Sequence, residues 1–210
     1  MKSLFVIGDS ISCYYGRHLE KMLAGVMTYD RKGRTNILKD LDDCTDGVNG
    51  GDSSMVLTYL REVVHKDWFK SDILLLNCGL HDIKQNQTTG VLQVPPELYK
   101  ENLGKIIAIV REKGISLVWA RTTPLNKKHP NYDGALFQRR TGCIDTYNGI
   151  ADQIMKDNTI PVIDLFTFTR NLGEDIYLNG IDNCHFNEQA AAQQAAFIAG
   201  WLAGQYGHGW

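Results

Sequence analysis

The most informative stretch of the chain is Leu4-Phe5-Val6-Ile7-Gly8-Asp9-Ser10-Ile11-Ser12. Its four consecutive apolar residues have the length of a strand that is buried on both faces. The glycine that follows permits a sharp turn, and Ser10 then falls at the start of a helix, near the positive end of the helix dipole. The stretch therefore predicts a buried strand, a polar turn and a helix in succession.

Three further apolar runs have strand length, namely Ile73–Leu76, Ile115–Trp119 and Ile160–Ile163. Between the runs lie segments with the i, i+3, i+4, i+7 spacing of amphipathic helices, such as Val56 to Val63 and Leu103 to Val110. Strands that alternate with helices imply a mainly parallel sheet with right-handed crossovers. The sequence thus predicts an α/β fold, a three-layer α/β/α sandwich with helices on both faces of the sheet.

Shorter signals mark the ends of elements. Pro95-Pro96-Glu97 predicts the start of a helix, and Lys113-Gly114 predicts its end. A last helix is expected to begin near Asn187, and Val26–Tyr29 is the expected second strand, whose register the sequence leaves open. No repeat, linker or change of composition marks a second domain, so residues 1–210 are expected to form one domain.

Composition excludes several classes of function. The 22 Lys and Arg residues against 24 Asp and Glu give a net charge of −2, and no long basic run exists, which argues against nucleic-acid binding. No apolar stretch reaches the length that spans a bilayer, so no membrane segment is expected. Five cysteines without a C-x-x-C pair favour a cytoplasmic setting, and a secreted form that has lost its leader stays open.

Polar residues cluster where ligands of such a sheet bind, beyond the carboxyl ends of the strands. These clusters are Gly8–Ser12, Val48–Ser54, Gly79–Asp82 and Asp182–His185. Each cluster alone is accounted for by a turn or a helix cap. Together they supply the nucleophile, oxyanion donors, orienting acid and base that acyl transfer from an ester needs.

These clusters resemble the motif blocks of the SGNH hydrolases, also called the GDSL esterase and lipase family. The resemblance runs from Ser3 to about Leu202. It implies a flavodoxin-like sheet of about five strands and a serine esterase that requires no metal or organic cofactor. Thr122-Thr123-Pro124 also looks like a threonine and proline segment of that family.

The resemblance assigns roles to four of the residues. It implies that Ser10 is the nucleophile and that its amide also serves the oxyanion hole. Gly51 is the implied second oxyanion donor, with Gly50 as the alternative. In the D-x-x-H block, Asp182 is the implied orienting acid and His185 the general base. A carboxylate on Nδ1 of the imidazole would leave Nε2 to accept the proton of the serine.

The third block departs from the family pattern. The family carries asparagine in G-x-N-D, whereas this chain has His81 in Gly79-Leu80-His81-Asp82. A protonated imidazole nitrogen also donates hydrogen bonds, so we take His81 as the third oxyanion donor, with a supporting role outside the hole as the alternative.

Short acyl esters, among them acetyl esters on carbohydrates, are the expected substrates, because no long apolar lid segment is present. The expected partner is a small-molecule or carbohydrate ester, and neither nucleic acid nor a membrane is expected. The sequence does not indicate the oligomeric state.

Three other functions fit some of the same residues. The missing asparagine suits a non-catalytic carbohydrate-binding or scaffold domain, and an acyltransferase or thioesterase would use the same triad. A metal site could use Cys78, His81, Asp182, Cys184 and His185. The adjacent pair Cys184-His185 is an awkward ligand spacing, however, and no C-x-x-C or H-E-x-x-H frame supports it.

Overall fold

Five parallel strands form the central sheet of the computed structural model, which describes residues 1–34, 47–127, 137–178 and 183–207. In spatial order the strands are β2 (Met27–Arg31), β1 (Lys2–Ile7), β3 (Ile73–Leu76), β5 (Ser116–Ala120) and β7 (Val162–Ile163). Every residue of β3 is buried, as expected for a strand that is covered on both faces. The predicted parallel sheet and its flavodoxin-like order are confirmed.

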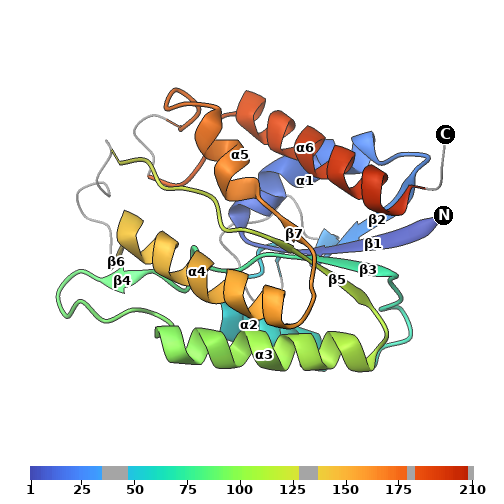
Figure 1. Cartoon of the computed structure of the whole chain (residues 1–210), viewed down its shortest axis with the longest axis horizontal. Helices are drawn as coiled ribbons and strands as arrows, with labels where there is room; N and C mark the ends of the chain where they lie inside the picture. The colour runs from blue at the N-terminus through green and yellow to red at the C-terminus, as the bar shows by residue number, and fades with distance from the viewer. Residues whose placement is uncertain (35–46, 128–136, 179–182, 208–210) are drawn as a thin grey trace.

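Helices cover both faces of the sheet (Figure 1). One face carries α1 (Ser10–Met22), α5 (Leu165–Asn171) and α6 (Glu188–Tyr206), and the other carries α2 (Ser53–Val63), α3 (Pro96–Glu112) and α4 (Thr141–Asp157). Helices α1 and α6 pack against each other, and α6 buries several small residues, among them Ala191 and Ala195. In the described ranges, no helix combines the length and apolarity that crossing a bilayer requires.

Most element boundaries agree with the sequence signals. Helix α3 begins at Pro96 and is capped at Lys113, and the side chain of Asn187 caps α6 by accepting from the amide of Ala190. The second strand lies slightly later than expected, at Met27–Arg31. The last strand is shorter than expected because the amide of Ile160 still bonds to the end of α4, so pairing starts only at Val162.

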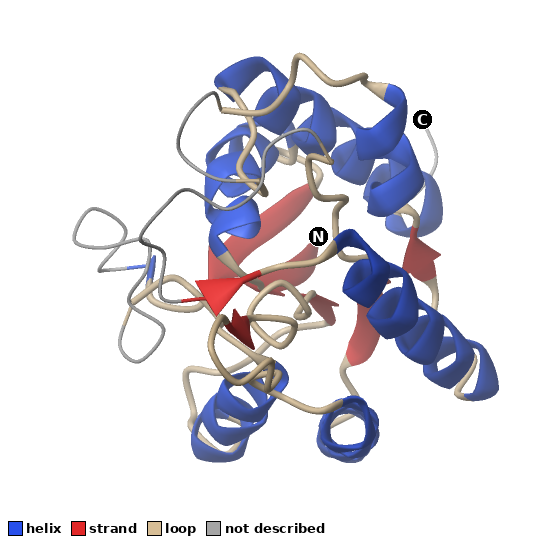
Figure 2. Ribbon diagram, turned by 90° about the vertical axis from the view of Figure 1, so that its left-hand side faces the viewer, coloured by secondary structure: helices blue, strands red, loops and turns tan. Residues whose placement is uncertain are grey.

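A second, two-stranded sheet was not predicted. It pairs β4 (Gln85–Asn86) with β6 (Phe137–Gln138) in antiparallel orientation. Strands of two residues carry no periodicity that a sequence pattern could reveal. This small sheet lies on the side of the molecule to which the carboxyl ends of the central strands point, and Figure 2 shows the molecule from that side.

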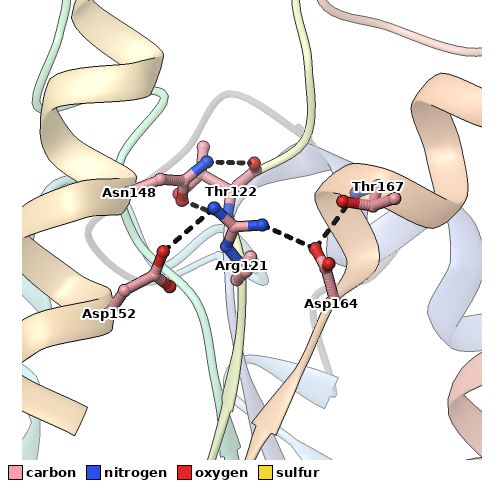
Figure 3. Close-up of polar contacts among 6 residues, drawn as sticks. All are labelled: Arg121, Thr122, Asn148, Asp152, Asp164 and Thr167. Carbon is pink, nitrogen blue, oxygen red and sulfur yellow. Dashed lines mark hydrogen bonds and ion pairs between the residues drawn. The ribbon is translucent and has the colours of Figure 1, made fainter. Parts of the chain in front are cut away.

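Polar contacts attach α4 and α5 to the end of β5 (Figure 3). Arg121 directly follows β5 and forms ion pairs with Asp152 of α4 at 2.9 Å and with Asp164 before α5 at 2.7 Å. Asn148 of α4 accepts from the amide of Thr122 at 3.0 Å and donates to its carbonyl at 2.9 Å. The chain that leaves β5 is therefore held at a defined position.

Candidate active site

A serine and a histidine meet at the carboxyl edge of the sheet. Ser10 is the first residue of α1, and its Oγ lies 2.7 Å from Nε2 of His185. Asp9 caps the helix by accepting from the amide of Ile11 at 3.0 Å, which fixes the start of α1 at Ser10. The Tyr14 ring, one turn further along α1, contacts the His185 ring edge to face with centroids 5.7 Å apart.

Main-chain hydrogen bonds hold the segment that carries His185. The carbonyl of His185 accepts from the amide of Leu178 at 3.0 Å, and the neighbouring residues Tyr177 and Phe186 form an antiparallel bridge. The carbonyl of Asn183 accepts from the amide of Asn126 at 2.7 Å. These bonds place the imidazole before α6 begins, so its Nε2 faces the start of α1.

The second loop lies directly against the first. The amide of Gly50 donates to the carbonyl of Gly8 at 2.8 Å. Gly51 has a φ of +71°, a left-handed conformation that favours glycine. Its amide donates to Oδ1 of Asn49 at 2.9 Å, so the predicted second oxyanion donor already has an acceptor in this structure.

The third loop packs against the end of β5. Gly79 lies so close to Thr122 that a Cβ on the glycine would be 2.3 Å from the threonine Oγ1. That hydroxyl donates to the carbonyl of Cys78 at 3.1 Å. The loop that presents His81 is thereby joined to Thr122, which α4 holds in turn through Asn148.

His81 is buried, with 5% of its surface exposed. Burial, together with the nearby cations Lys84 and Arg139, lowers the pKa of this imidazole to about 3. His81 is therefore neutral near pH 7, with one nitrogen that donates and one that accepts. A neutral imidazole retains the donor that an oxyanion hole needs.

Two buried carboxyl groups flank these loops. Asp82 accepts from the amide of Ser53 at 2.9 Å, while its Oδ2 has no hydrogen-bond partner among the described residues. Burial raises the pKa of Asp82 to about 7. Burial also raises the pKa of Asp9, whose Oδ2 is likewise without a partner in the described part of the chain. Both carboxyl groups brace the loops that carry the candidate catalytic residues.

Of the site residues predicted from the sequence, the structure brings Ser10 and His185 into hydrogen-bond contact. Asp182, the predicted orienting acid, lies outside the described residues. Within the described ranges, no group of three His, Cys, Asp or Glu side chains is arranged to hold a metal ion.

Sequence reasoning gave no role to several residues that shape this site. Asn49 holds the amide of Gly51, Asp82 holds the second loop, and Arg139 contacts the third loop through a 2.7 Å bond from its Nε to the carbonyl of Leu80. Asp82 stood beside His81 in the third block, which was a usable signal. No signal in the sequence marked Arg139, because it lies outside the motif blocks.

The GDSL-like Lipase/Acylhydrolase family matches residues 6–193 of the chain. The match spans nearly the whole chain and contains Ser10, Gly51, His81 and His185. No curated protein sequence matches the chain significantly.

Solved structures with the same fold include three esterases or acylhydrolases. A lipase/acylhydrolase from Enterococcus faecalis has a TM-score of 0.69 at 18% identity, over 98% of this chain and 97% of its own. The acetyl xylan esterase AlAXEase has a TM-score of 0.68 at 16% identity, over 96% and 98%. Est24, a carbohydrate acetylesterase from Sinorhizobium meliloti, has a TM-score of 0.64 at 16% identity, over 98% and 100%. At these identities the likeness shows a shared fold.

Proposed function

Because the chain belongs to the GDSL-like lipase/acylhydrolase family and is a hydrolase of ester bonds, we propose that Ser10 is its nucleophile and His185 its general base. The single observation that carries this assignment is the 2.7 Å contact between Ser10 Oγ and His185 Nε2. That distance is within hydrogen-bond reach, which proton transfer from a serine to a base requires.

Acylation follows from this contact. Nε2 of His185 accepts the Ser10 proton while Oγ attacks the ester carbonyl carbon, and a tetrahedral intermediate forms. The intermediate collapses as the bond to the alcohol oxygen breaks, and the imidazolium returns its proton to the leaving alcohol. Water then attacks the acyl-serine with His185 as base, releases the carboxylic acid and restores the serine.

The oxyanion of the intermediate accepts from the amides of Ser10 and Gly51 and from His81. The amide of Ser10 is supported as a donor by its position at the N-terminus of α1. The amide of Gly51 leaves Oδ1 of Asn49 for the oxyanion, because a charged oxygen accepts a stronger hydrogen bond than an amide carbonyl. Neutral His81 supplies the third bond.

The orienting acid in this mechanism is Asp182. A carboxylate three residues before His185 is suited to accept from Nδ1 of the imidazole, which selects the tautomer whose Nε2 is free to act as base. The acid orients the base and does not react, so its loss is expected to cost less activity than the loss of Ser10.

The proposed substrates are esters of short acyl groups, with acetyl groups on carbohydrates as the first candidates. Two proteins of the same fold are an acetyl xylan esterase and a carbohydrate acetylesterase, and this likeness supports the choice. A series of p-nitrophenyl esters from acetate to octanoate tests it, followed by acetate release from acetylated xylo-oligosaccharides. A preference for long acyl chains, or acyl transfer to an added sugar in place of hydrolysis, would contradict it.

Intact-mass spectrometry after exposure to a small fluorophosphonate tests the nucleophile without a guess at the substrate. We expect a single adduct on the wild-type protein and none on Ser10→Ala. Circular dichroism of both proteins checks that they are folded. A folded wild-type protein that forms no adduct would favour a non-catalytic carbohydrate-binding domain.

We also propose that residues 1–210 form one domain and that the protein works in the cytoplasm. The five-stranded sheet and the helices on its two faces share one core, which supports a single domain. Within the described ranges, Cys13, Cys78, Cys143 and Cys184 take part in no disulfide bond, which suits a reducing compartment. A single calorimetric transition and cell fractionation test the two points.

A further inference from the structure

We propose that Arg139 is a positioning residue that aligns the loop carrying His81 with the loop carrying His185. The inference rests on the proposed function and adds to it a residue that belongs to none of the motif blocks. The two loops are distant in the chain, and a serine hydrolase requires its oxyanion donors and its base to be aligned with each other to fractions of an ångström.

The side chain of Arg139 contacts both loops. Its Nε donates to the carbonyl of Leu80 at 2.7 Å, directly before His81. Its Nη1 lies 3.4 Å from Sγ of Cys184, directly before His185. One planar guanidinium therefore contacts the chain neighbour of each histidine, and its rigid geometry fixes the spacing between the two contacts.

The main chain of Arg139 contributes a third contact. Its carbonyl accepts from Nδ2 of Asn183 at 3.2 Å, so the backbone and the side chain of the arginine both hold the His185 loop. The Cys184 Sγ lies in turn 3.8 Å from Nδ1 of His185. A displacement of Arg139 would consequently be transmitted to the imidazole of the base.

The small sheet explains how Arg139 reaches this position. Strand β4 begins shortly after His81, and Arg139 directly follows β6. The register pairs Gln85 with Gln138, and Nε2 of Gln138 also donates to Oε1 of Gln85 at 3.2 Å. The pairing of β4 with β6 thus delivers the arginine beside the loop that presents His81.

The charge of Arg139 agrees with the same role. Two cations contact the Phe137 ring, with Arg139 Cζ 4.9 Å and Lys84 Nζ 4.5 Å from its centroid. Both cations help to keep His81 neutral, as its lowered pKa shows. The arginine thus acts on the position and on the protonation state of the proposed oxyanion donor.

Matched substitutions test the inference. Arg139→Gln removes the guanidinium, and Arg140→Gln removes the same charge from the next residue, which is exposed and makes no side-chain cap on α4. We expect Arg139→Gln to lower kcat by roughly 10- to 100-fold with KM nearly unchanged, since a misplacement of about 1 Å can cost 10²-fold. The kcat of Arg140→Gln should stay within about twofold of the wild-type kcat, because this substitution displaces neither loop.

Chemical rescue separates positioning from a purely structural role. Millimolar guanidinium added to Arg139→Ala should restore part of kcat, because the free cation can occupy the vacated site, whereas the same salt should leave Arg140→Ala unchanged. Arg139→Lys keeps the charge but cannot span both loops, so its kcat should fall between those of the wild type and Arg139→Gln.

Fluorophosphonate labelling distinguishes the two proposals. If the wild-type protein is not labelled, the proposed function itself fails. If the wild type is labelled and Arg139→Gln matches Arg140→Gln in kcat, the positioning role is wrong. The positioning role would also be overturned by three results together. Arg139→Gln would have a lower melting temperature, guanidinium would not rescue Arg139→Ala, and Arg139→Lys would keep the kcat of the wild type. Should Arg139→Gln fail to fold, Arg139→Lys alone decides, because a wild-type kcat for that variant contradicts the need for both contacts.

Discussion

Oγ of Ser10 lies 2.7 Å from Nε2 of His185, and the helices that follow these two residues pack against each other. Ser10 opens α1, and His185 lies shortly before α6. Oε1 of Glu188, the first residue of α6, lies 2.8 Å from Nε2 of His18 in α1. Glu188 also forms an ion pair with Arg17 of α1. The contact between the two catalytic candidates is thus supported by the packing of α1, which Ser10 opens, against α6, which begins just after His185.

Replacement of Ser10 by alanine should lower kcat by roughly 10⁴-fold or more, as should replacement of His185, because each removes a reacting group. Ser12→Ala is the matched control, since Oγ of Ser12 donates to the carbonyl of Asp9 at 2.7 Å and accepts from Nη2 of Arg31 at 3.1 Å. Steady-state hydrolysis of p-nitrophenyl acetate measures all three. A loss in Ser12→Ala equal to that in Ser10→Ala would show that the nucleophile is misassigned.

Replacement of His81 by alanine should lower kcat by about 10²-fold, the cost of losing one oxyanion donor. His81→Asn supplies an amide donor and should lose less. The pKa of His81 is near 3, so its titration should leave no trace in the kcat/KM profile above about pH 5. Profiles of the wild type and His81→Asn should therefore share their acid limb. An unchanged kcat in His81→Ala would remove His81 from the oxyanion hole.

Asp82 should make the protein relatively more stable in mild acid. Its pKa is about 7 in the folded protein and near 3.8 when unfolded, so between these values the folded state binds the extra proton. The free energy of unfolding that Asp82 contributes must then rise as the pH falls from about 7 to about 4. Melting temperatures of the wild type and Asp82→Asn measure it. The difference in favour of the wild type should grow on acidification.

His81 has the opposite linkage, because its pKa is lowered and the unfolded chain binds the proton below about pH 6.5. In the wild type, the pH-dependent contributions of Asp82 and His81 to the free energy of unfolding therefore oppose each other. Each contribution can be measured only by replacing one of the two residues. A difference between wild type and Asp82→Asn that does not change with pH would contradict the raised pKa of Asp82.

Gly79→Ala should destabilise the protein by about 1–3 kcal/mol, because the new Cβ would meet Oγ1 of Thr122 at 2.3 Å. The added variant Thr122→Ala should recover part of that loss by removing the hydroxyl. Gly104→Ala is the control, since this glycine lies within α3 and has open space around it. Alanine there should stabilise by up to about 1 kcal/mol. Urea unfolding measures all of these, and a neutral Gly79→Ala would contradict the close approach.

Asn148→Ala should destabilise the protein by about 2–4 kcal/mol, because the buried amide and carbonyl of Thr122 both lose their partner (Figure 3). Asp152→Ala should cost less than about 1 kcal/mol, since its ion pair with Arg121 is partly exposed and screened by solvent. Urea unfolding compares the two variants. Equal losses of unfolding free energy in the two variants would show that the hydrogen bonds from Asn148 to Thr122 stabilise the protein no more than the ion pair does.

The sequence alone predicted the class of fold, which the structure confirms, and it named Ser10 and His185 as candidates, whose catalytic roles stay predictions. Buried strands such as Leu4–Ile7 and Ile73–Leu76 are continuous apolar runs, and the period of the helices between them differs from that of strands. Ser10 and His185 could be named as candidates because short local motifs carry them, and the structure brings the two side chains into contact. Asp182 remains a prediction, since it lies outside the described residues.

The tertiary structure alone decided how the site is held together. The β4–β6 sheet, the contacts of Arg139 with two loops, and the hydrogen bond from the amide of Gly51 to Asn49 all depend on main-chain positions that no side-chain pattern encodes. The pKa values of His81 and Asp82 likewise depend on burial and on charges brought in from distant segments. Hydrophobic periodicity and local motifs are written in the order of residues, whereas alignment and electrostatics arise only when separate segments pack together.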